Sequence, residues 1–470
     1  MDNSTRTGRQ SPEAGSFDWP MANEAEQLLR TTMVRFLDGN SFAKVLSERM
    51  RNETATEFFE WIDHFGLGSE YEEPLREAGF EIESGGETAD DETVLAHPRA
   101  TLPRVLLKRE QRDNAVVIAL RPESIADFAG SHNLRSHIRG EPFSQFRRVI
   151  VARENGNALE AVERHAYRGF IEKSLCGAEL ESVIKAKELW RTRPRQFADD
   201  AEGFRATNEI LNQVLALVGR DRACQYFFEN DRSYWQGRNR AARAQKHRQD
   251  QLGLGWGNHD HHTFRCSRGH FADLIDFLQR LGFDKRERFY AGCEAGWGAQ
   301  ILENPVTGIV VFADVDLMPE ERPIDFSRDP LPATGQLGTV GLWVGLHGES
   351  FLEAGMHHLE ARFDFDLLRA QLKSQGVSTM APFSDFKFLR QAFTEGEHWA
   401  VRRERLDKLL ATGLLTREQF KRFAAEGAIG SHLENLQRHG GFKGFNQKSV
   451  SAIIAAIDPR KTHFAEASAS

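Results

Sequence analysis

The sequence has little cysteine, and this scarcity limits the kinds of site that it can build. Its four cysteines, Cys176, Cys224, Cys266 and Cys293, are scattered through 470 residues and include no C-x-x-C pair. This spacing argues against a disulfide scaffold and against a zinc site made of thiolates. Any bound metal must therefore be held by histidine and carboxylate side chains.

Long hydrophobic runs and excess positive charge are also missing. No apolar run approaches the ~20 residues that a membrane-spanning helix needs, and the N-terminus lacks the apolar core of a signal peptide. We therefore expect a cytoplasmic protein with no membrane partner. The formal net charge is −8, which is no general reason to expect binding to nucleic acid.

The chain is long enough for two or three domains, each with its own core. Residues 1–20 are rich in Ser, Gly, Asn and Pro, which predicts a disordered tail. Residues 21–250 combine helical periodicity with several strand-like apolar runs, which predicts a helical and mixed α/β N-terminal domain. Residues 257–458 are predicted to form a second domain, and residues 459–470 a C-terminal tail.

Two stretches of the second domain follow one pattern. Residues 260–266 and 356–363 are each typical of a strand that carries adjacent histidines and continues into an amphipathic helix, after which further strand-like segments follow. The shared order of strand, helix and strands indicates a weak internal repeat of about 95 residues. The paired histidines open both copies.

Strand geometry separates the two histidines of each pair, because successive side chains point to opposite faces. His262 and His357 fall on the apolar faces of their strands, which leaves His261 and His358 on the polar faces. These two are the candidate metal ligands, and a buried, hydrogen-bonded core histidine is the alternative for each. If the parity of a strand is off by one residue, the ligands would instead come from His259, His262, His357 and His432.

A carboxylate on a third predicted strand completes the set. Glu434 lies 76 residues after His358, which itself lies 97 residues after His261. Two histidines and one carboxylate form the facial triad that leaves positions open on non-haem Fe(II) for substrate and oxygen. Because the separations are long, only the fold can bring the three side chains together.

These stretches resemble the 4-hydroxyphenylpyruvate dioxygenase-like enzymes of the vicinal oxygen chelate superfamily. Asp260 and His261 are similar to the start of that family's first ligand strand, Gly355–Leu359 to its second, and Leu433–Phe442 to its closing signature. The resemblance covers roughly residues 257–458. It implies an α+β fold in which a vicinal-oxygen-chelate-type domain of paired βαβββ modules follows a largely helical and mixed N-terminal region.

By the same resemblance, Fe(II) would be held by His261, His358 and Glu434, and Phe442 and Phe445 would line the substrate cavity. The implied activity is that of a non-haem Fe(II)-dependent dioxygenase that acts on a 2-oxo acid and O2. Such an enzyme couples oxidative decarboxylation to hydroxylation of the same substrate.

An anionic substrate needs a cation or hydrogen-bond donors. Arg265 and Arg362 share the polar strand faces with the candidate histidines, and Gln300 lies on a further predicted strand. These three are the candidate catalytic and substrate-binding residues. Alternatively, the arginines pair with Glu360 or with other carboxylates.

Other functions remain open from the sequence. The same superfamily hosts ring-cleaving dioxygenases, isomerases and lyases, some of which use other divalent metals such as zinc or manganese. A binding protein with a degenerate site is a further alternative. We expect a small-molecule substrate and neither a nucleic-acid nor a membrane partner, and we keep a homo-oligomer as an open alternative.

Overall fold

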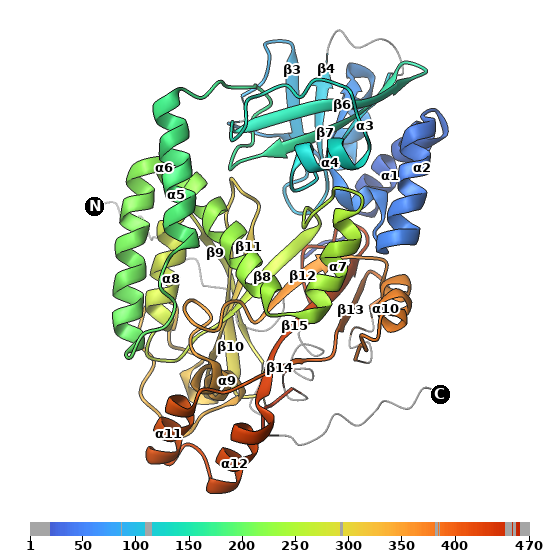
Figure 1. Ribbon diagram of the computed structural model, residues 1–470. Coiled ribbons are helices and arrows are strands. Elements are labelled where there is room, and N and C mark those ends of the chain that lie inside the picture. Colours follow the sequence, from blue (N-terminus) through green and yellow to red (C-terminus); the bar gives the residue numbers. More distant parts are fainter. Residues whose placement is uncertain are drawn as a thin grey trace, which may run out of the picture.

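Two mixed β-sheets form the framework of the protein, and helices pack around both of them (Figure 1). The computed structural model describes residues 19–85, 87–108, 115–291, 295–380, 384, 386–446, 454 and 457–460. The predicted α+β fold class is confirmed by this architecture. Most of the two predicted tails, and Cys293, lie outside the described residues.

The first sheet, at the top of Figure 1, has seven strands in the order β2-β3-β4-β1-β5-β7-β6. The strands are β1 (Ile62–Gly68), β2 (Glu81–Ile82), β3 (Glu92–Ala96), β4 (Arg104–Lys108), β5 (Val117–Leu120), β6 (Phe146–Glu154) and β7 (Asn157–Arg164). The short apolar runs of β4 and β5 are buried at the centre of this sheet, as expected for strands covered on both faces.

The connections of the first sheet define two modules. β1 pairs with β4 in parallel, and the chain between them passes through α3 (Glu72–Glu77) and two further strands. β5 pairs with β7 in parallel after passing through α4 (Ile125–Ser131) and β6. The two opening strands, β1 and β5, meet antiparallel at the centre. The mixed N-terminal region is therefore itself a pair of crossover modules.

The second sheet lies below the first in Figure 1 and has eight strands. Seven follow the order β13-β15-β12-β8-β11-β10-β9, and β14 pairs with β15 beside this path. The strands are β8 (His259–Arg265), β9 (Asp284–Tyr290), β10 (Trp297–Glu303), β11 (Val310–Asp316), β12 (His358–Arg362), β13 (Leu389–Phe393), β14 (Glu397–Trp399) and β15 (Ala428–Arg438).

Each half of the second sheet is a βαβββ module. β8 pairs in parallel with β11 after the crossover helix α8 (Phe271–Arg280), and β12 pairs in parallel with β15 after α10 (Phe365–Ser374). β8 and β12 pair antiparallel and join the modules. The paired modules predicted from the repeat are thus present, and the two strands with histidine pairs are neighbours at the centre of the sheet.

The remaining helices cover the sheets. They are α1 (Asn23–Asp38), α2 (Ser41–Arg49), α5 (Gly177–Arg191), α6 (Asp200–Gly237), α7 (Arg240–Asp250), α9 (Thr339–His347), α11 (Arg403–Ala411) and α12 (Arg417–Glu426), with the short turns η1 (Met50–Thr54), η2 (Phe58–Trp61), η3 (Ser69–Tyr71) and η4 (Pro319–Glu321). α6 bends at Gly219, whose φ of 74° is readily adopted only by glycine.

Helix α8 illustrates why the crossovers pack onto the sheet. Its apolar residues recur every three or four positions, so they share one face of the helix. That face is buried in a core that also contains Phe264 of β8, the adjacent Cys266, and Phe227 and Phe228 of α6. The apolar strand face is thereby used for packing, and the opposite face of β8 is left for polar side chains.

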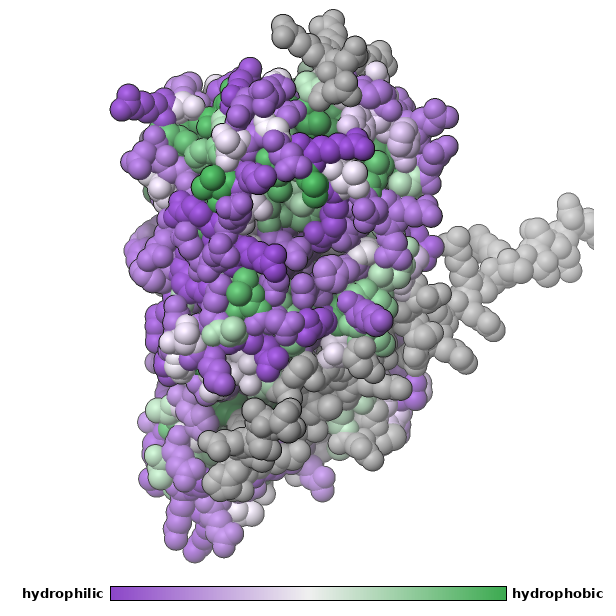
Figure 2. Space-filling model, turned by 90° about the vertical axis from the view of Figure 1, so that its right-hand side faces the viewer, coloured by the Kyte–Doolittle hydropathy of each residue, from purple (hydrophilic) through white to green (hydrophobic). Residues whose placement is uncertain are grey.

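The described helices include none that combines the length and apolar character required to cross a bilayer. The face of the molecule shown in Figure 2 is mostly hydrophilic, with small separate hydrophobic areas between the polar ones.

Candidate metal centre

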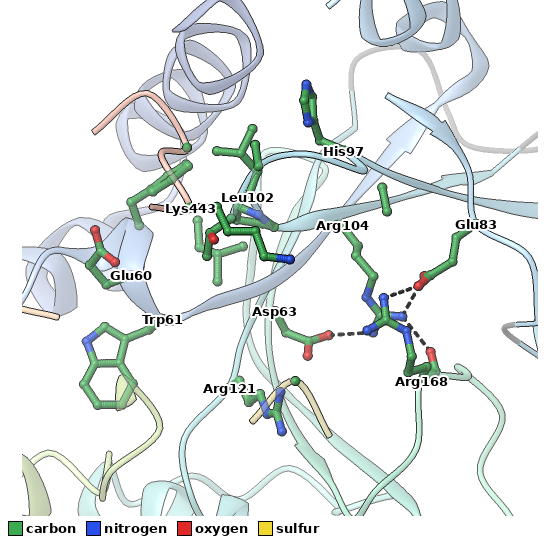
Figure 3. A pocket seen from close by; sticks show the side chains of 18 of the residues that line it. Glu60, Trp61, Asp63, Glu83, His97, Leu102, Arg104, Arg121, Arg168 and Lys443 are labelled. Atoms are coloured by element: carbon green, nitrogen blue, oxygen red, sulfur yellow. Dashed lines mark hydrogen bonds and ion pairs between the residues drawn. The ribbon is translucent and has the colours of Figure 1, made fainter. Parts of the chain in front are cut away.

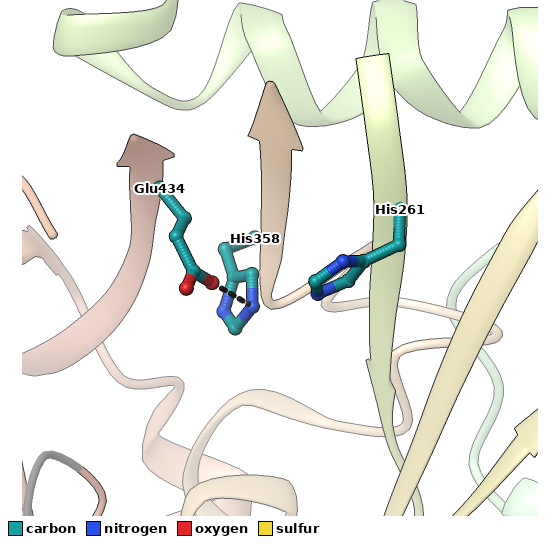
Figure 4. A group of neighbouring side chains, drawn as sticks. All are labelled: His261, His358 and Glu434. Carbon is teal, nitrogen blue, oxygen red and sulfur yellow. Dashed lines mark ion pairs between the residues drawn. The ribbon is translucent and has the colours of Figure 1, made fainter. Parts of the chain in front are cut away.

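Three neighbouring strands of the second sheet carry the candidate ligands (Figure 4). His261 lies on β8, His358 opens β12, and Glu434 lies on β15. All three side chains are buried, and one ligand atom from each lies within 4.8 Å of the others. The fold thus brings the predicted triad together, while its occupation by a metal stays a prediction.

Strand pairing explains why these side chains meet. Glu360 on β12 lies opposite both His261 on β8 and Glu434 on β15. His358, two residues before Glu360, points to the same face of the sheet because side chains alternate. A slip of one residue in either pairing would turn a ligand to the opposite face.

The four alternative histidines each contact the backbone or an aromatic ring. Nδ1 of His259, His357 and His432 lies 2.9, 3.0 and 3.2 Å, respectively, from a backbone carbonyl oxygen. The ring of His262 packs edge-on against Phe228, at 5.0 Å between centroids. These contacts are typical of core histidines and agree with the strand parity predicted from the sequence, although His357 also lines the cavity beside the candidate ligands.

Glu360 adds a second carboxylate to the site, which the sequence suggested only as a partner for arginine. Its Oε2 forms an ion pair with Nε2 of His261. Nε2 of Gln391 donates a hydrogen bond to Oε1 of Glu434 at 3.0 Å and lies 3.4 Å from Oε1 of Glu360. Gln391 therefore holds the two carboxylates in one cavity.

Burial sets the protonation of these groups. It raises the pKa of Glu434 to about 8, and burial together with the nearby charge of Glu434 raises the pKa of Glu360 well above its usual value. Two neighbouring buried carboxyl groups resist ionising together, and a divalent cation between them would stabilise both ionised forms. The donor set therefore fits a metal ion.

His358 is available as a ligand. Its Nε2 lies 3.0 Å from Oε2 of Glu434, and its Nδ1 has no hydrogen-bond partner among the described residues. Burial lowers the pKa of His358 to about 3, so the ring is neutral at physiological pH. A neutral imidazole offers the lone pair that binds a metal.

Asp260 fixes the other ring nitrogen of His261. Its Oδ1 lies 3.3 Å from Nδ1 of His261. Arg362 and Arg438 donate to Oδ2 of Asp260 at 2.9 and 3.2 Å. Burial would raise the pKa of Asp260, but the two guanidinium groups outweigh it and hold the pKa well below its usual value. An ionised acceptor of this kind orients a metal-binding imidazole.

The cavity beside the ligands is small and mainly apolar. Its volume is ≈ 30 Å³, and aromatic side chains form much of its wall: Trp297, Phe312, Phe393 and Phe445. The predicted cavity residue Phe445 is among them. The other one, Phe442, packs instead against Leu389, Leu436 and Phe388.

The three candidate substrate residues lie in different places. Arg265 lines the cavity, and its Nε and Nη2 atoms are buried without a hydrogen-bond partner among the described residues. Arg362 ends β12 and is bonded to Asp260, away from the cavity. Nε2 of Gln300 donates to two backbone carbonyl oxygens. The structure therefore brings only Arg265 of the three to the candidate ligands.

The first sheet repeats this arrangement with two changes. Ala119 on β5 lies opposite both His64 on β1 and Glu160 on β7, which is the position that Glu360 has in the second sheet. His64 and Glu160 thus take the places of the first histidine and the carboxylate ligand. Val117 takes the place of the second histidine, and it lines a cavity of ≈ 200 Å³ together with His64 and Glu160.

A sequence signal for this repeat exists. An Asp-His pair stands at residues 63–64 and again at 260–261, and Leu-Glu-x-x-x-Arg-His stands at 159–165 and again at 433–439. Each of these short motifs can be recognised as part of a repeat only when the strand register is known. Together they show that equivalent strand positions in the two sheets carry similar residues. Only the second sheet has histidines at both of the ligand positions.

Comparisons with known proteins leave the family of the chain open. No protein-family model and no curated protein matches it. Similar solved structures include a mutant of 4-hydroxymandelate synthase from Streptomyces coelicolor, with 12% identity over 86% of this chain and 98% of that chain and a TM-score of 0.28. Another is a xylose isomerase-like TIM barrel/4-hydroxyphenylpyruvate dioxygenase fusion protein, with 10% identity over 88% of this chain and 57% of that chain and a TM-score of 0.22.

Methylmalonyl-CoA epimerase from Mycobacterium tuberculosis is similar at 13% identity over 39% of this chain and 88% of that chain, with a TM-score of 0.22. At these identities and TM-scores, none of the three carries its activity over to this chain. The function must therefore be argued from the side chains of the site.

Proposed function

We propose that this chain is a metal-dependent enzyme of the vicinal oxygen chelate type, a non-haem Fe(II)-dependent dioxygenase that acts on a 2-oxo acid. The observation that supports the proposal is the buried set of His261, His358 and Glu434, whose ligand atoms lie within 4.8 Å of one another. Two imidazoles and one carboxylate suit ferrous iron and leave positions open for substrate and oxygen.

The bound iron would supply the redox chemistry with O2, and the protein would supply orientation and a dry environment. Asp260 orients His261, and Gln391 holds the carboxylate of Glu434 by a 3.0 Å hydrogen bond. The aromatic wall, which includes Phe312 and Phe393, limits the entry of water to the site. Exclusion of water protects reactive intermediates from side reactions.

Arg265 is the residue best placed to bind the carboxylate of a 2-oxo acid. Its guanidinium group is fully buried, lines the cavity, and retains two nitrogen atoms without hydrogen-bond partners among the described residues. Asp314, the neighbouring acidic residue in the strand pairing, has its pKa raised to about 7 by burial. It is therefore a weak counter-ion, and an anionic substrate would pair with Arg265 more strongly.

The test is metal analysis and oxygen uptake on protein purified without air. We expect one iron per chain, and one O2 consumed for each CO2 released from an accepted member of a panel of 2-oxo acids. His358→Ala should lose both iron and oxygen uptake, whereas replacement of the exposed His398 by Ala should change neither. Bound zinc or manganese without oxygen uptake would contradict the proposal.

Glu360 favours a second candidate, a metal-dependent isomerase or lyase. A carboxylate beside the triad can serve as a general base, which proton abstraction next to a carbonyl group requires. Its short ion pair with His261 places it at the site. Exchange of substrate hydrogen with deuterium from solvent, without O2 consumption and lost in Glu360→Gln, would establish this function in place of the first.

A further inference from the structure

A cleft with a volume of ≈ 550 Å³ lies between the two sheets (Figure 3). Asp63 and Arg104 lie on strands of the first sheet, Arg121 directly follows β5, and Arg362 and Arg438 lie on strands of the second sheet. The cleft shares no lining residue with the metal cavity. It is therefore a separate space, and its volume lies in the range of ~300–1,000 Å³ typical of small-molecule sites.

Positive charge predominates in the lining of the cleft. Eight arginine and lysine side chains face six aspartate and glutamate side chains. Seven of the eight cations form ion pairs, for example Arg164 with Asp63 at 2.8 Å and Lys443 with Glu303 at 2.7 Å. These pairs account for their charges within the protein.

Arg121 is the eighth cation. Its guanidinium group makes no hydrogen bond or ion pair with any residue that the structure describes, although Asp63 lies near it (Figure 3). Its backbone is fixed, because Arg121 directly follows β5 and its N–H donates to the carbonyl oxygen of Trp61 at 2.7 Å. The side chain is thus held at the cleft without an internal partner.

The surroundings of Arg121 disfavour its charged form. Burial lowers the pKa of Arg121, and the charges of Arg104, Arg232 and Arg168 lower it further, against the opposite effect of Asp63. Arg121 is half-buried and lines the cleft, so an anion that enters the cleft can reach its guanidinium group. A guanidinium group held at a cleft without an internal partner is available to an anionic ligand.

We propose that the cleft between the sheets binds a small organic anion whose carboxylate or phosphate group pairs with Arg121. The planar guanidinium fork binds either group through two parallel hydrogen bonds. Figure 3 shows that Arg104 and Arg168 are held by Glu83 and Asp63, which leaves Arg121 free for the ligand. The lining has eight cations against six carboxylates, and this excess of positive charge favours an anion.

The test uses the metal-free full chain, so that an anion bound to the metal is not counted. Calorimetric titration with inorganic pyrophosphate and with citrate distinguishes a phosphate ligand from a carboxylate ligand. We expect at least one of them to bind, and Arg121→Gln to weaken that binding by about 10- to 100-fold, as loss of a charged hydrogen-bonded pair implies.

Arg328→Gln is the matched control, because Arg328 is exposed and lies outside the cleft. It should bind the anion as the wild type does. The proposal is overturned if neither probe binds, or if Arg121→Gln binds the probes as tightly as the wild type does.

A thermal-stability measurement separates a ligand site from a structural role. Because Arg121 has no described partner to lose, we expect Arg121→Gln to keep or raise the Tm. If that variant does not fold, Arg121→Lys takes its place, since lysine keeps the charge but not the planar fork. Weaker anion binding by Arg121→Lys supports the proposal, and unchanged binding overturns it.

Discussion

Glu360 and Glu434 lie directly opposite each other on the parallel strands β12 and β15, so two buried carboxylates share one cavity. Gln391 contacts both, and His261 and His358 complete the surroundings. The arrangement brings two acidic groups together where a bound cation would stabilise their ionised forms. Substitution of one glutamate at a time can therefore distinguish the role of Glu360 from that of Glu434.

Glu434→Gln should abolish tight metal binding. An amide is a much poorer ligand for a divalent transition metal than a carboxylate, and we expect the metal content to fall by at least about tenfold. Because the substitution also removes one of two repelling buried carboxylates, the Tm of the metal-free protein should not fall. Metal analysis and thermal unfolding measure the two effects. Unchanged metal content would show that Glu434 is not a ligand.

Glu360→Gln should separate a three-residue ligand set from a larger one. If His261, His358 and Glu434 suffice, the variant keeps its metal, and its oxygen uptake falls by less than about 100-fold, the lower end of the effect of general acid–base catalysis. Loss of metal to the extent seen in Glu434→Gln would show instead that Glu360 is a fourth ligand. Glu395→Gln, outside the cavity, is the control.

Asp260→Asn should weaken the metal site and the fold together. Asp260 accepts hydrogen bonds from Arg362 and Arg438 and contacts His261. Loss of its charge leaves two guanidinium groups without a partner at this position, which costs about 3–5 kcal/mol of unfolding free energy. Metal affinity should fall by about 10- to 100-fold. The exposed Asp366, which pairs with Arg390, provides the control Asp366→Asn.

The stability of the metal-free protein should fall as pH rises from about 5 to about 8. Burial raises the folded-state pKa of Glu434 to about 8, whereas an unfolded glutamate has a pKa of about 4.3. Between these values the folded state binds more protons, so the free energy of unfolding decreases with rising pH. Urea unfolding across this range measures the slope, which should be smaller in Glu434→Gln and in the presence of metal.

Val117→His should create a second metal site in the first sheet. Val117 occupies the place of His358, and His64 and Glu160 already occupy the places of the other two ligands. We expect the metal content to rise from one to about two ions per chain, since a third ligand completes the set. The double variant Val117→His/Glu160→Gln should return to one ion. No gain of metal in Val117→His would show that the two sheets differ at this position in more than one ligand.

The sequence by itself determined which side chains share a strand face. Alternation is a local property of extended backbone, so His261 and His358 could be separated from His262 and His357 without a structure. The order of strand, helix and strands likewise predicted the crossover modules, because apolar periodicity distinguishes the two kinds of element. Glu434 was predicted as a ligand because its segment resembles the closing signature of the 4-hydroxyphenylpyruvate dioxygenase-like enzymes.

Only the tertiary structure decided what depends on the pairing of distant strands. The register of β12 against β8 and β15 brought Glu360 into the site, and contacts beyond the strand directed Arg362 to Asp260 and Phe442 to a different core. Register and packing arise from interactions between segments about 75–100 residues apart, and no local pattern encodes them. For the same reason, Arg121 could be recognised as a cation without a partner only after the two sheets were in place.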